Sequence, residues 1–237
     1  MRFSIVIPAR NEERWLGACL ESIRVAAAPF PGLVETVVVI NRCTDQTETV
    51  ARSLGARTVE MGGKNLSKIR NAGAQVATGD ILVTIDADSV MAPNTLSEID
   101  RLLASGHYIG GGTWARLERM SLGIAMTYIP LLTLLVVWHG ISAGLFWIRR
   151  ADFESIGGFN ETIVSAEDMD FAMRVKAFGR RHGKRFGTLW RAPITTSCRK
   201  FDHFGDWYLL RNAPRFLSML GGHNEQLANH FFYDFPH

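Results

Sequence analysis

The stretch DILVTIDAD, residues 80–88, places two carboxylates one residue apart directly after a short apolar run. Residues 81–85 hold only aliphatic side chains and one threonine, which is typical of a buried strand. In an open α/β sheet, ligands bind at the carboxyl ends of the strands, which is where Asp86 and Asp88 stand. Two carboxylates this close repel each other unless a cation lies between them, and hard oxygen ligands suit Mg²⁺ or Mn²⁺. The stretch therefore predicts a strand that ends in a divalent metal site.

Strands and helices alternate around this stretch through the first half of the chain. We expect strands over residues 3–8, 34–40, 57–60 and 81–85. Between and after them we expect four helices: one capped by Asn11 with Glu12 in its first turn, one capped by Thr44, one over residues 67–77, and one opened by Pro93. This repetition with short connections predicts an α/β fold whose mostly parallel sheet has helices on both faces.

The pattern changes after about residue 106. A glycine-containing strand is expected over residues 108–114, where something approaches the backbone closely, and a helix over residues 166–178. No linker, repeat or low-complexity segment interrupts the chain. The sequence therefore favours a single domain over residues 1–237, with a first half over 1–105 and a second half over 106–237.

Composition excludes several classes of protein. The net charge is only +3, and no basic stripe interleaved with aromatic residues is present, so nucleic acid is not an expected partner. Cys19, Cys43 and Cys198 are odd in number and far apart, which argues against a disulfide framework or a zinc site. A reducing, cytoplasmic location is the simple inference. The apolar run at residues 3–8 is too short for a signal peptide and is expected to be the first strand.

The segment from residue 120 to residue 148 lacks Asp, Glu, Lys and Arg. It is long enough to cross a bilayer, but Pro130, Gly140 and Gly144 interrupt it. We expect instead a helix over about residues 121–139, followed by a buried strand around 144–148. A helix that is apolar nearly all round should contact something, so residues 120–148 are expected to meet a membrane surface, a lipid-like acceptor or a second subunit.

Several short motifs occur in a fixed order over about residues 3–180. They are IVIPARNE at 5–12, VVVINRCTD at 37–45, RNAG at 70–73, DAD at 86–88, GGFNE at 157–161 and AEDMD at 166–170. Together they resemble the family 2 glycosyltransferases, which have a GT-A fold. The resemblance implies a metal-dependent, inverting transfer of one sugar, of the hexosyltransferase type, from a UDP- or GDP-sugar to a glycan, a lipid-linked acceptor or a small hydroxyl compound.

The resemblance also implies roles for individual residues. Donor-binding residues would be Pro8, Ala9, Arg10, Glu12, Asn41, Asp45, Lys68, Arg70, Asp86 and Ala87. Asp88 would bind Mn²⁺ or Mg²⁺ directly, with Asp86 and His203 as further metal ligands. Asp168 would be the base that removes the proton of the acceptor hydroxyl, since attack by that hydroxyl requires one. Acceptor-binding residues would be Glu167, Gly158 and Trp147.

Some of these roles compete with ordinary structural ones. A tryptophan such as Trp147 is more often part of a core, and a surface position for His203 is an equally good interpretation. The segment 197–207, which carries a basic, acidic and histidine cluster, is expected to form a lid over the diphosphate.

The chain departs from the family pattern in two places. Ile40 and Asn41 stand where the family often has two adjacent acids, which leaves the nucleotide base open, although an amide can still bond a base edge. The Gln-x-x-Arg-Trp motif of processive synthases is absent, which argues against a polymer-extruding enzyme.

Two alternative functions remain from the sequence. A haloacid-dehalogenase-type phosphatase would use Asp86 and Asp88 in a nucleophile loop, but three expected strands precede them. A non-catalytic, membrane-associated adaptor with the same fold would explain the apolar segment but not the set of Asp86, Asp88 and Asp168.

Overall fold

The computed structural model describes residues 1–134, 139–142 and 144–212. Its main sheet has the strand order β3-β2-β1-β4-β8-β6-β9. The strands are β1 (Phe3–Ala9), β2 (Val34–Ile40), β3 (Arg57–Glu60), β4 (Ile81–Ile85), β6 (Tyr108–Gly112), β8 (Leu145–Arg149) and β9 (Arg185–Thr188). Neighbouring strands from β3 to β4 run parallel, β8 runs antiparallel to both of its neighbours, and β6 and β9 are parallel. The expected mostly parallel α/β sheet is confirmed.

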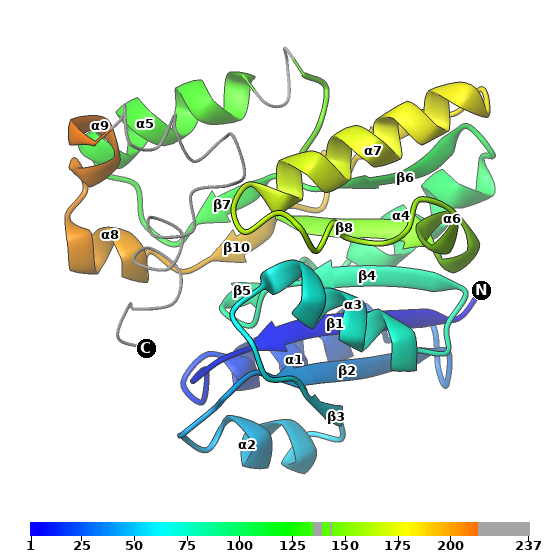
Figure 1. Cartoon of the computed structure of the whole chain (residues 1–237), viewed down its shortest axis with the longest axis horizontal. Helices are drawn as coiled ribbons and strands as arrows, with labels where there is room; N and C mark the ends of the chain where they lie inside the picture. The colour runs from blue at the N-terminus through cyan, green and yellow to red at the C-terminus, as the bar shows by residue number, and fades with distance from the viewer. Residues whose placement is uncertain (135–138, 143, 213–237) are drawn as a thin grey trace.

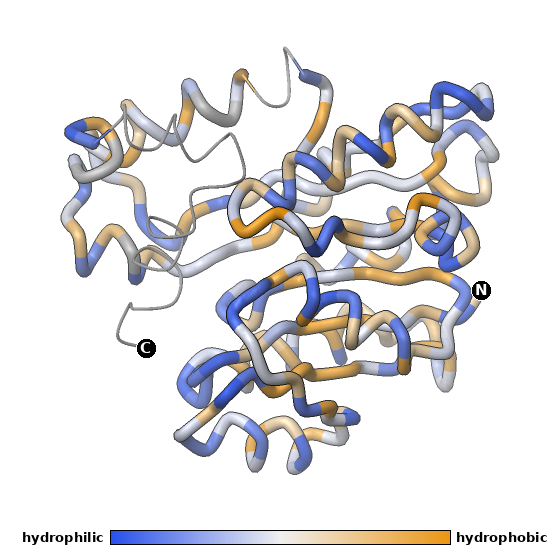
Figure 2. The backbone as a smooth tube through the Cα atoms, in the orientation of Figure 1, coloured by the Kyte–Doolittle hydropathy of each residue, from blue (hydrophilic) through white to orange (hydrophobic). Residues whose placement is uncertain are grey.

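Helices cover both faces of this sheet, as Figure 1 shows. On one face lie α1 (Leu16–Ala26) and α4 (Thr95–Ala104), whose apolar side chains pack on one core cluster with β1 and β4. On the other lie α3 (Leu66–Val76), α6 (Arg150–Ser155) and α7 (Glu167–Arg181), which form a second core cluster. Figure 2 shows mostly apolar colour along the central strands and polar colour at the loops beyond the ends of β1 and β2. The polar residues of this part of the chain therefore lie beyond the ends of β1 and β2, at one edge of the sheet.

A second, three-stranded sheet has the order β5-β10-β7. It is formed by β5 (Ser89–Val90), β7 (Ala115–Leu117) and β10 (Ile194–Thr196). β10 leads into α8 (Arg199–Phe204), and α9 (Tyr208–Arg211) follows near α5 (Leu122–Thr133). β5 comes directly after the acidic pair and pairs with β10. The residues of β10 and those that follow it therefore lie close to the end of β4.

The structure corrects two expected helix starts. Asn11 does not cap a helix: its backbone has φ +53°, and its side-chain Oδ1 accepts a hydrogen bond from the backbone N–H of Thr44 at 2.8 Å. Helix α1 therefore begins later, at Leu16. Thr44 does not cap the next helix either, because α2 (Thr47–Ser53) begins after Gln46, and the N–H of its first residue donates to the carboxylate of Asp45 at 3.0 Å. The Asn11 contact instead ties the loop after β1 to the loop after β2.

The glycine strand β6 is approached by the protein's own core. A Cβ on Gly111 would lie 1.9 Å from the carbonyl oxygen of Gly187 and 2.7 Å from the ring of Trp147. The Trp147 side chain fills the space that the two glycines leave and is 0% exposed. The prediction that Trp147 binds an acceptor is therefore wrong: a ring without exposed surface cannot stack on a sugar.

The apolar segment begins as expected. Helix α5 starts at Leu122, and the strand after it is β8. The expected end of the helix at about residue 139 is wrong: α5 ends at Thr133, and His139 is not helical, while residues 135–138 between them lie outside the described residues. Leu122, Met126 and Ile129 leave half or more of their surface exposed along α5. None of the helices in the described part of the chain has both the length and the apolar composition that a bilayer crossing requires.

Candidate active site

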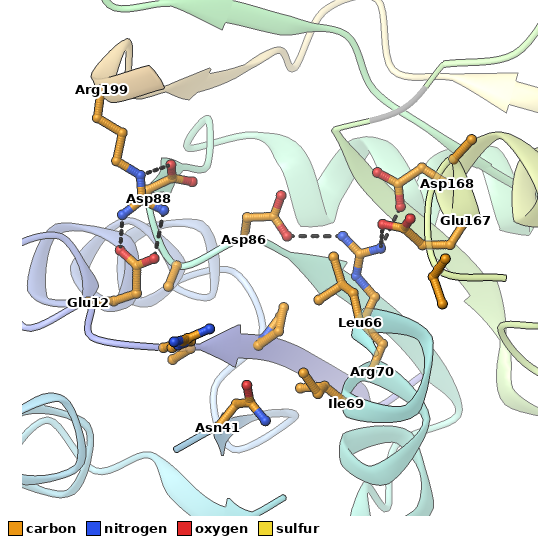
Figure 3. Close-up of a pocket in the computed structure, with 16 residues that line it drawn as sticks. Glu12, Asn41, Leu66, Ile69, Arg70, Asp86, Asp88, Glu167, Asp168 and Arg199 are labelled. Carbon is orange, nitrogen blue, oxygen red and sulfur yellow. Dashed lines mark hydrogen bonds and ion pairs between the residues drawn. The ribbon is translucent and has the colours of Figure 1, made fainter. Parts of the chain in front are cut away.

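A pocket lies where β1, β2 and β4 end, beside the beginnings of α3 and α7 (Figure 3). It brings together most of the residues that the sequence motifs nominate. These are Pro8, Ala9, Arg10, Glu12, Asn41, Arg70, Asp86, Ala87, Asp88, Glu167 and Asp168. The two halves of the chain therefore contribute to one pocket, with the acidic pair of β4 between them.

Arg70 joins the acidic pair to the start of α7. Its side chain is 5% exposed, and its Nη2 donates to Oδ1 of Asp86 at 3.0 Å. Its Nη1 donates to Oδ1 of Asp168 at 2.5 Å and lies 3.5 Å from Oε1 of Glu167. The guanidinium also lies 5.2 Å from the ring centre of Phe159. The three carboxylates raise the pKa of Arg70 further above its usual range against the effect of its burial, so this arginine is a fixed cation.

Arg199 is a second cation of the pocket. In Figure 3 it lies on the opposite side of Asp86 from Arg70. Its Nη1 and Nη2 donate to the two carboxylate oxygens of Glu12 at 2.8 and 2.7 Å. Its Nε lies 3.2 Å from Oδ2 of Asp88. Ser197 donates its hydroxyl to the same oxygen at 2.8 Å. The loop after β1, the acidic pair and the segment after β10 are thus held together by charge.

Burial shifts the pKa of two of these acids. It raises the pKa of Glu12 from its usual 4.5 to about 7, although the hydrogen bonds and charge of Arg199 act in the opposite direction. It also raises the pKa of Glu167 to about 7, helped by the charge of Asp168 and opposed by that of Arg70. Near neutral pH both acids can therefore hold or release a proton.

Three predicted donor or metal residues do not line this pocket. Asp45 uses its carboxylate to accept from the backbone N–H groups of Glu13 and Thr47 at 3.1 and 3.0 Å. Lys68 is exposed on α3, and His203 is exposed on α8. Among the residues that the structure describes, no cluster of three or more His, Cys, Asp or Glu side chains could hold a metal ion, so His203 is not brought to the acidic pair.

Gly158, a predicted acceptor residue, lies in a neighbouring hollow rather than in the pocket. That hollow is also lined by Asn71, Arg150 and Glu161. Gly158 has φ +66°, and a Cβ there would lie 2.7 Å from Oδ1 of Asn71. A glycine is therefore needed for the turn itself, which holds the second half of the chain against α3 through the hydrogen bond from the N–H of Phe159 to Asn71.

Asp86 and Asp88 fit a divalent cation that takes part of its coordination from a substrate. Mg²⁺ sites often use only one or two carboxylates, with substrate phosphates as the other ligands. Both side chains line the pocket, with exposed fractions of 46% for Asp86 and 15% for Asp88. The contacts of Asp88 with Ser197 and Arg199 both fall on Oδ2, which leaves its other oxygen for a cation.

Sequence reasoning missed Arg199 as a site residue, as well as four residues that shape the walls: Leu66, Ile69, Val164 and Ala166. The signal for Arg199 was the charged cluster of residues 197–207, which was expected to form a lid. Its partner Glu12 could not be identified, because the two residues are 187 positions apart.

Replacing Glu167 by glutamine is expected to flatten the dependence of stability on pH. Because the pKa of Glu167 is higher in the folded than in the unfolded chain, the folded state binds more protons between about pH 4.5 and pH 7. The unfolding free energy of the unsubstituted protein should therefore fall as pH rises through this window, by roughly 1–3 kcal/mol more than that of the variant. Urea unfolding at pH 5, 6, 7 and 8 measures the difference.

The control is Glu154→Gln, which removes an exposed glutamate on α6. It should keep the slope of the unsubstituted protein. A residual slope in Glu167→Gln is expected from Glu12, whose pKa is also raised. Equal slopes in the unsubstituted protein and in Glu167→Gln would contradict the raised pKa of Glu167.

Comparison with known proteins adds a family and a set of similar folds. The model of the family described as "Glycosyl transferase family 2" matches residues 4–157. An uncharacterized glycosyltransferase of Mycobacterium tuberculosis (strain ATCC 25618 / H37Rv) is 33% identical over 102 residues, which is 41% of this chain and 44% of the relative. The match thus spans less than half the length of that curated relative.

Two solved structures show the same fold. Staphylococcus aureus TarS in complex with UDP-GlcNAc has a TM-score of 0.66 at 19% identity, covering 99% of this chain and 71% of that one. Glucosyl-3-phosphoglycerate synthase of M. tuberculosis, in complex with Mn²⁺, UDP-glucose and phosphoglyceric acid, has a TM-score of 0.59 at 21% identity, covering 93% of this chain and 80% of that one.

Proposed function

Since this chain belongs to glycosyl transferase family 2, we propose that it moves one sugar from a UDP-sugar to a hydroxyl acceptor, with inversion at the anomeric carbon and with Mn²⁺ or Mg²⁺ as cofactor. The observation that carries the proposal is the pocket at the ends of β1, β2 and β4, where Asp86, Asp88, Arg70 and Asp168 lie together. The family assignment leaves the phosphatase alternative without support. An adaptor would have no need for this set of charged groups.

Asn41 favours uracil over cytosine as the base. Its Nδ2 donates to the carbonyl oxygens of Met61 and Gly63 at 2.7 and 2.9 Å, so the opposite amide orientation would place oxygen against oxygen. Its Oδ1 is buried, has no hydrogen-bond partner among the described residues, and belongs to a side chain that lines the pocket. In Figure 3 this oxygen lies on the side of the Asn41 amide that faces Asp86. A buried acceptor without a partner favours a base with a ring N–H, which uracil and guanine have and cytosine lacks.

The diphosphate of the donor would lie between the acidic pair and the cations of the pocket. Asp88 and Asp86 would hold the divalent cation, which stabilises the negative charge that develops on a diphosphate leaving group. Arg10, which directly follows β1, lines the same pocket and would bind a phosphate there through charge-assisted hydrogen bonds. Asp45, Lys68 and His203 would join the donor only if their segments move towards the pocket.

Asp168 is the proposed base. It lies at the start of α7, is 33% exposed on the pocket side, and receives a hydrogen bond from Arg70 that orients its carboxylate. Glu167, beside it, would contact the acceptor. Residues 106–237 would form the acceptor half, with Gly158 shaping its turn and the apolar residues 120–148 contacting a lipid-linked acceptor, a membrane surface or a second subunit.

A nucleotide panel tests the proposal. UDP with Mn²⁺ should raise the melting temperature and bind at least about tenfold more tightly than CDP, because CDP would leave the buried oxygen of Asn41 unpaired. Chelation of the metal should remove most of the shift. Equal shifts for UDP and CDP would contradict the role of Asn41, a larger shift with GDP would identify a guanosine donor, and no shift with any nucleotide would overturn the proposed function.

A further inference from the structure

Arg199 places a positive charge beside Asp88, an expected metal ligand, and contacts one of its two carboxylate oxygens. The guanidinium is 19% exposed, and Glu12 holds it through two hydrogen bonds of 2.7 and 2.8 Å. Two parallel hydrogen bonds fix the plane of a guanidinium as well as its place. The Glu12 side chain is only 6% exposed, so this anchor is shielded from water. Arg199 is therefore a positioned charge and not a mobile surface side chain.

Backbone hydrogen bonds also place Arg199 beside Asp88. β10 pairs with β5 in the register Thr196 to Ser89, and the hydroxyls of these two residues lie 3.0 Å apart. The N–H of Ser197 then donates to the carbonyl oxygen of Asp88 at 3.2 Å. The chain thus reaches Arg199 directly from a strand that is hydrogen-bonded to the segment of the acidic pair. These backbone hydrogen bonds therefore hold the Arg199 guanidinium beside Asp88.

We infer that Arg199 is a positioning residue that neutralises Asp88 in the free protein, so that Mn²⁺ or Mg²⁺ binds well only together with the donor diphosphate. This rests on the metal site of the proposed function. A cation placed next to Asp88 in the free protein would lie close to the fixed positive charge of Arg199. A diphosphate supplies negative charge to both cations and removes the repulsion between them. Binding of the metal and of the nucleotide is therefore coupled, and each raises the affinity of the other by the same factor.

The test measures Mn²⁺ binding without any nucleotide, from the electron paramagnetic resonance signal of free Mn²⁺. Arg199→Gln should bind Mn²⁺ about tenfold more tightly than the unsubstituted protein, because one positive charge beside Asp88 is gone. At pH 8, where Glu12 is ionised, Glu12→Gln should bind it more weakly, because the pocket loses a negative charge while Arg199 remains. Arg199→Lys keeps the charge and should bind Mn²⁺ like the unsubstituted protein. Arg191→Gln, which removes an exposed arginine before β10, is the matched control and should have no effect.

The coupling is measured by repeating the titration of UDP with and without Mn²⁺. Mn²⁺ should raise the affinity for UDP by a smaller factor in Arg199→Gln than in the unsubstituted protein. If Asp88→Asn abolishes Mn²⁺ binding while Arg199→Gln leaves both the Mn²⁺ affinity and the coupling unchanged, the role of Arg199 is refuted and the proposed function stands. If Asp88→Asn leaves Mn²⁺ binding unchanged, the metal site itself is wrong, and this inference fails with it.

Discussion

Replacing Arg70 by methionine is expected to cost about 3 kcal/mol of unfolding free energy. Breaking a buried ion pair from one side costs about 3–5 kcal/mol, because a charge is left without compensation. The lower end applies here, since Asp86 and Asp168 are 46% and 33% exposed and water can solvate them partly, whereas Glu167 is 12% exposed. Urea unfolding at pH 7 measures the loss.

The matched control for this prediction is Lys68→Met, which removes a cation from an exposed position of the same helix and should change stability little. The double variant Arg70→Met/Glu167→Gln should recover part of the loss, because the most buried of the three carboxylates no longer carries a charge. A variant Arg70→Met as stable as the unsubstituted protein would show that the three acids do not depend on this cation.

The substitution Asp168→Asn is expected to lower turnover by about two to four orders of magnitude, the usual contribution of a general base. An amide cannot take the proton of the acceptor hydroxyl, but its oxygen can still accept the hydrogen bond of Arg70. Affinity for UDP should therefore stay within a few-fold of that of the unsubstituted protein. UDP release with a panel of UDP-sugars gives the turnover, and calorimetry gives the affinity.

Asp170→Asn is the control for this substitution. Asp170 is on the same helix, pairs with Arg174 at 2.7 Å, and does not line the pocket, so its loss should leave turnover nearly unchanged. If donor affinity collapses in Asp168→Asn while Asp170→Asn behaves normally, Asp168 binds the donor and is not the base.

Strand β4 and the acidic pair after it can be predicted from the sequence because their signals are local. An apolar run followed by Asp86 and Asp88 needs no distant partner to be identified, and β4 has the predicted bounds, Ile81–Ile85. The buried faces of α1 and α4 follow in the same way from helical spacing. Local signals failed at the helix starts, since Asn11 has the residue type of a cap but bonds to Thr44, which is 33 positions away.

The environment of Trp147 could not be predicted from local sequence. Its burial depends on Gly111 and Gly187, which lie on two strands that pair beside β8. Only the sheet order brings both glycines under the ring. The same limit applies to Arg199, whose role depends on a strand pairing between residues more than one hundred positions apart.

The alternating strands and helices of the first half of the chain, the family motifs and the acids of the pocket can be predicted from short windows of sequence, because hydrophobic period and motif chemistry are local. Which cation each acid meets depends on the fold: Arg70 for Asp86, Glu167 and Asp168, and Arg199 for Glu12 and Asp88. The energy of a buried charge depends on the charges within a few ångströms of it, and these come from segments that are far apart in the sequence.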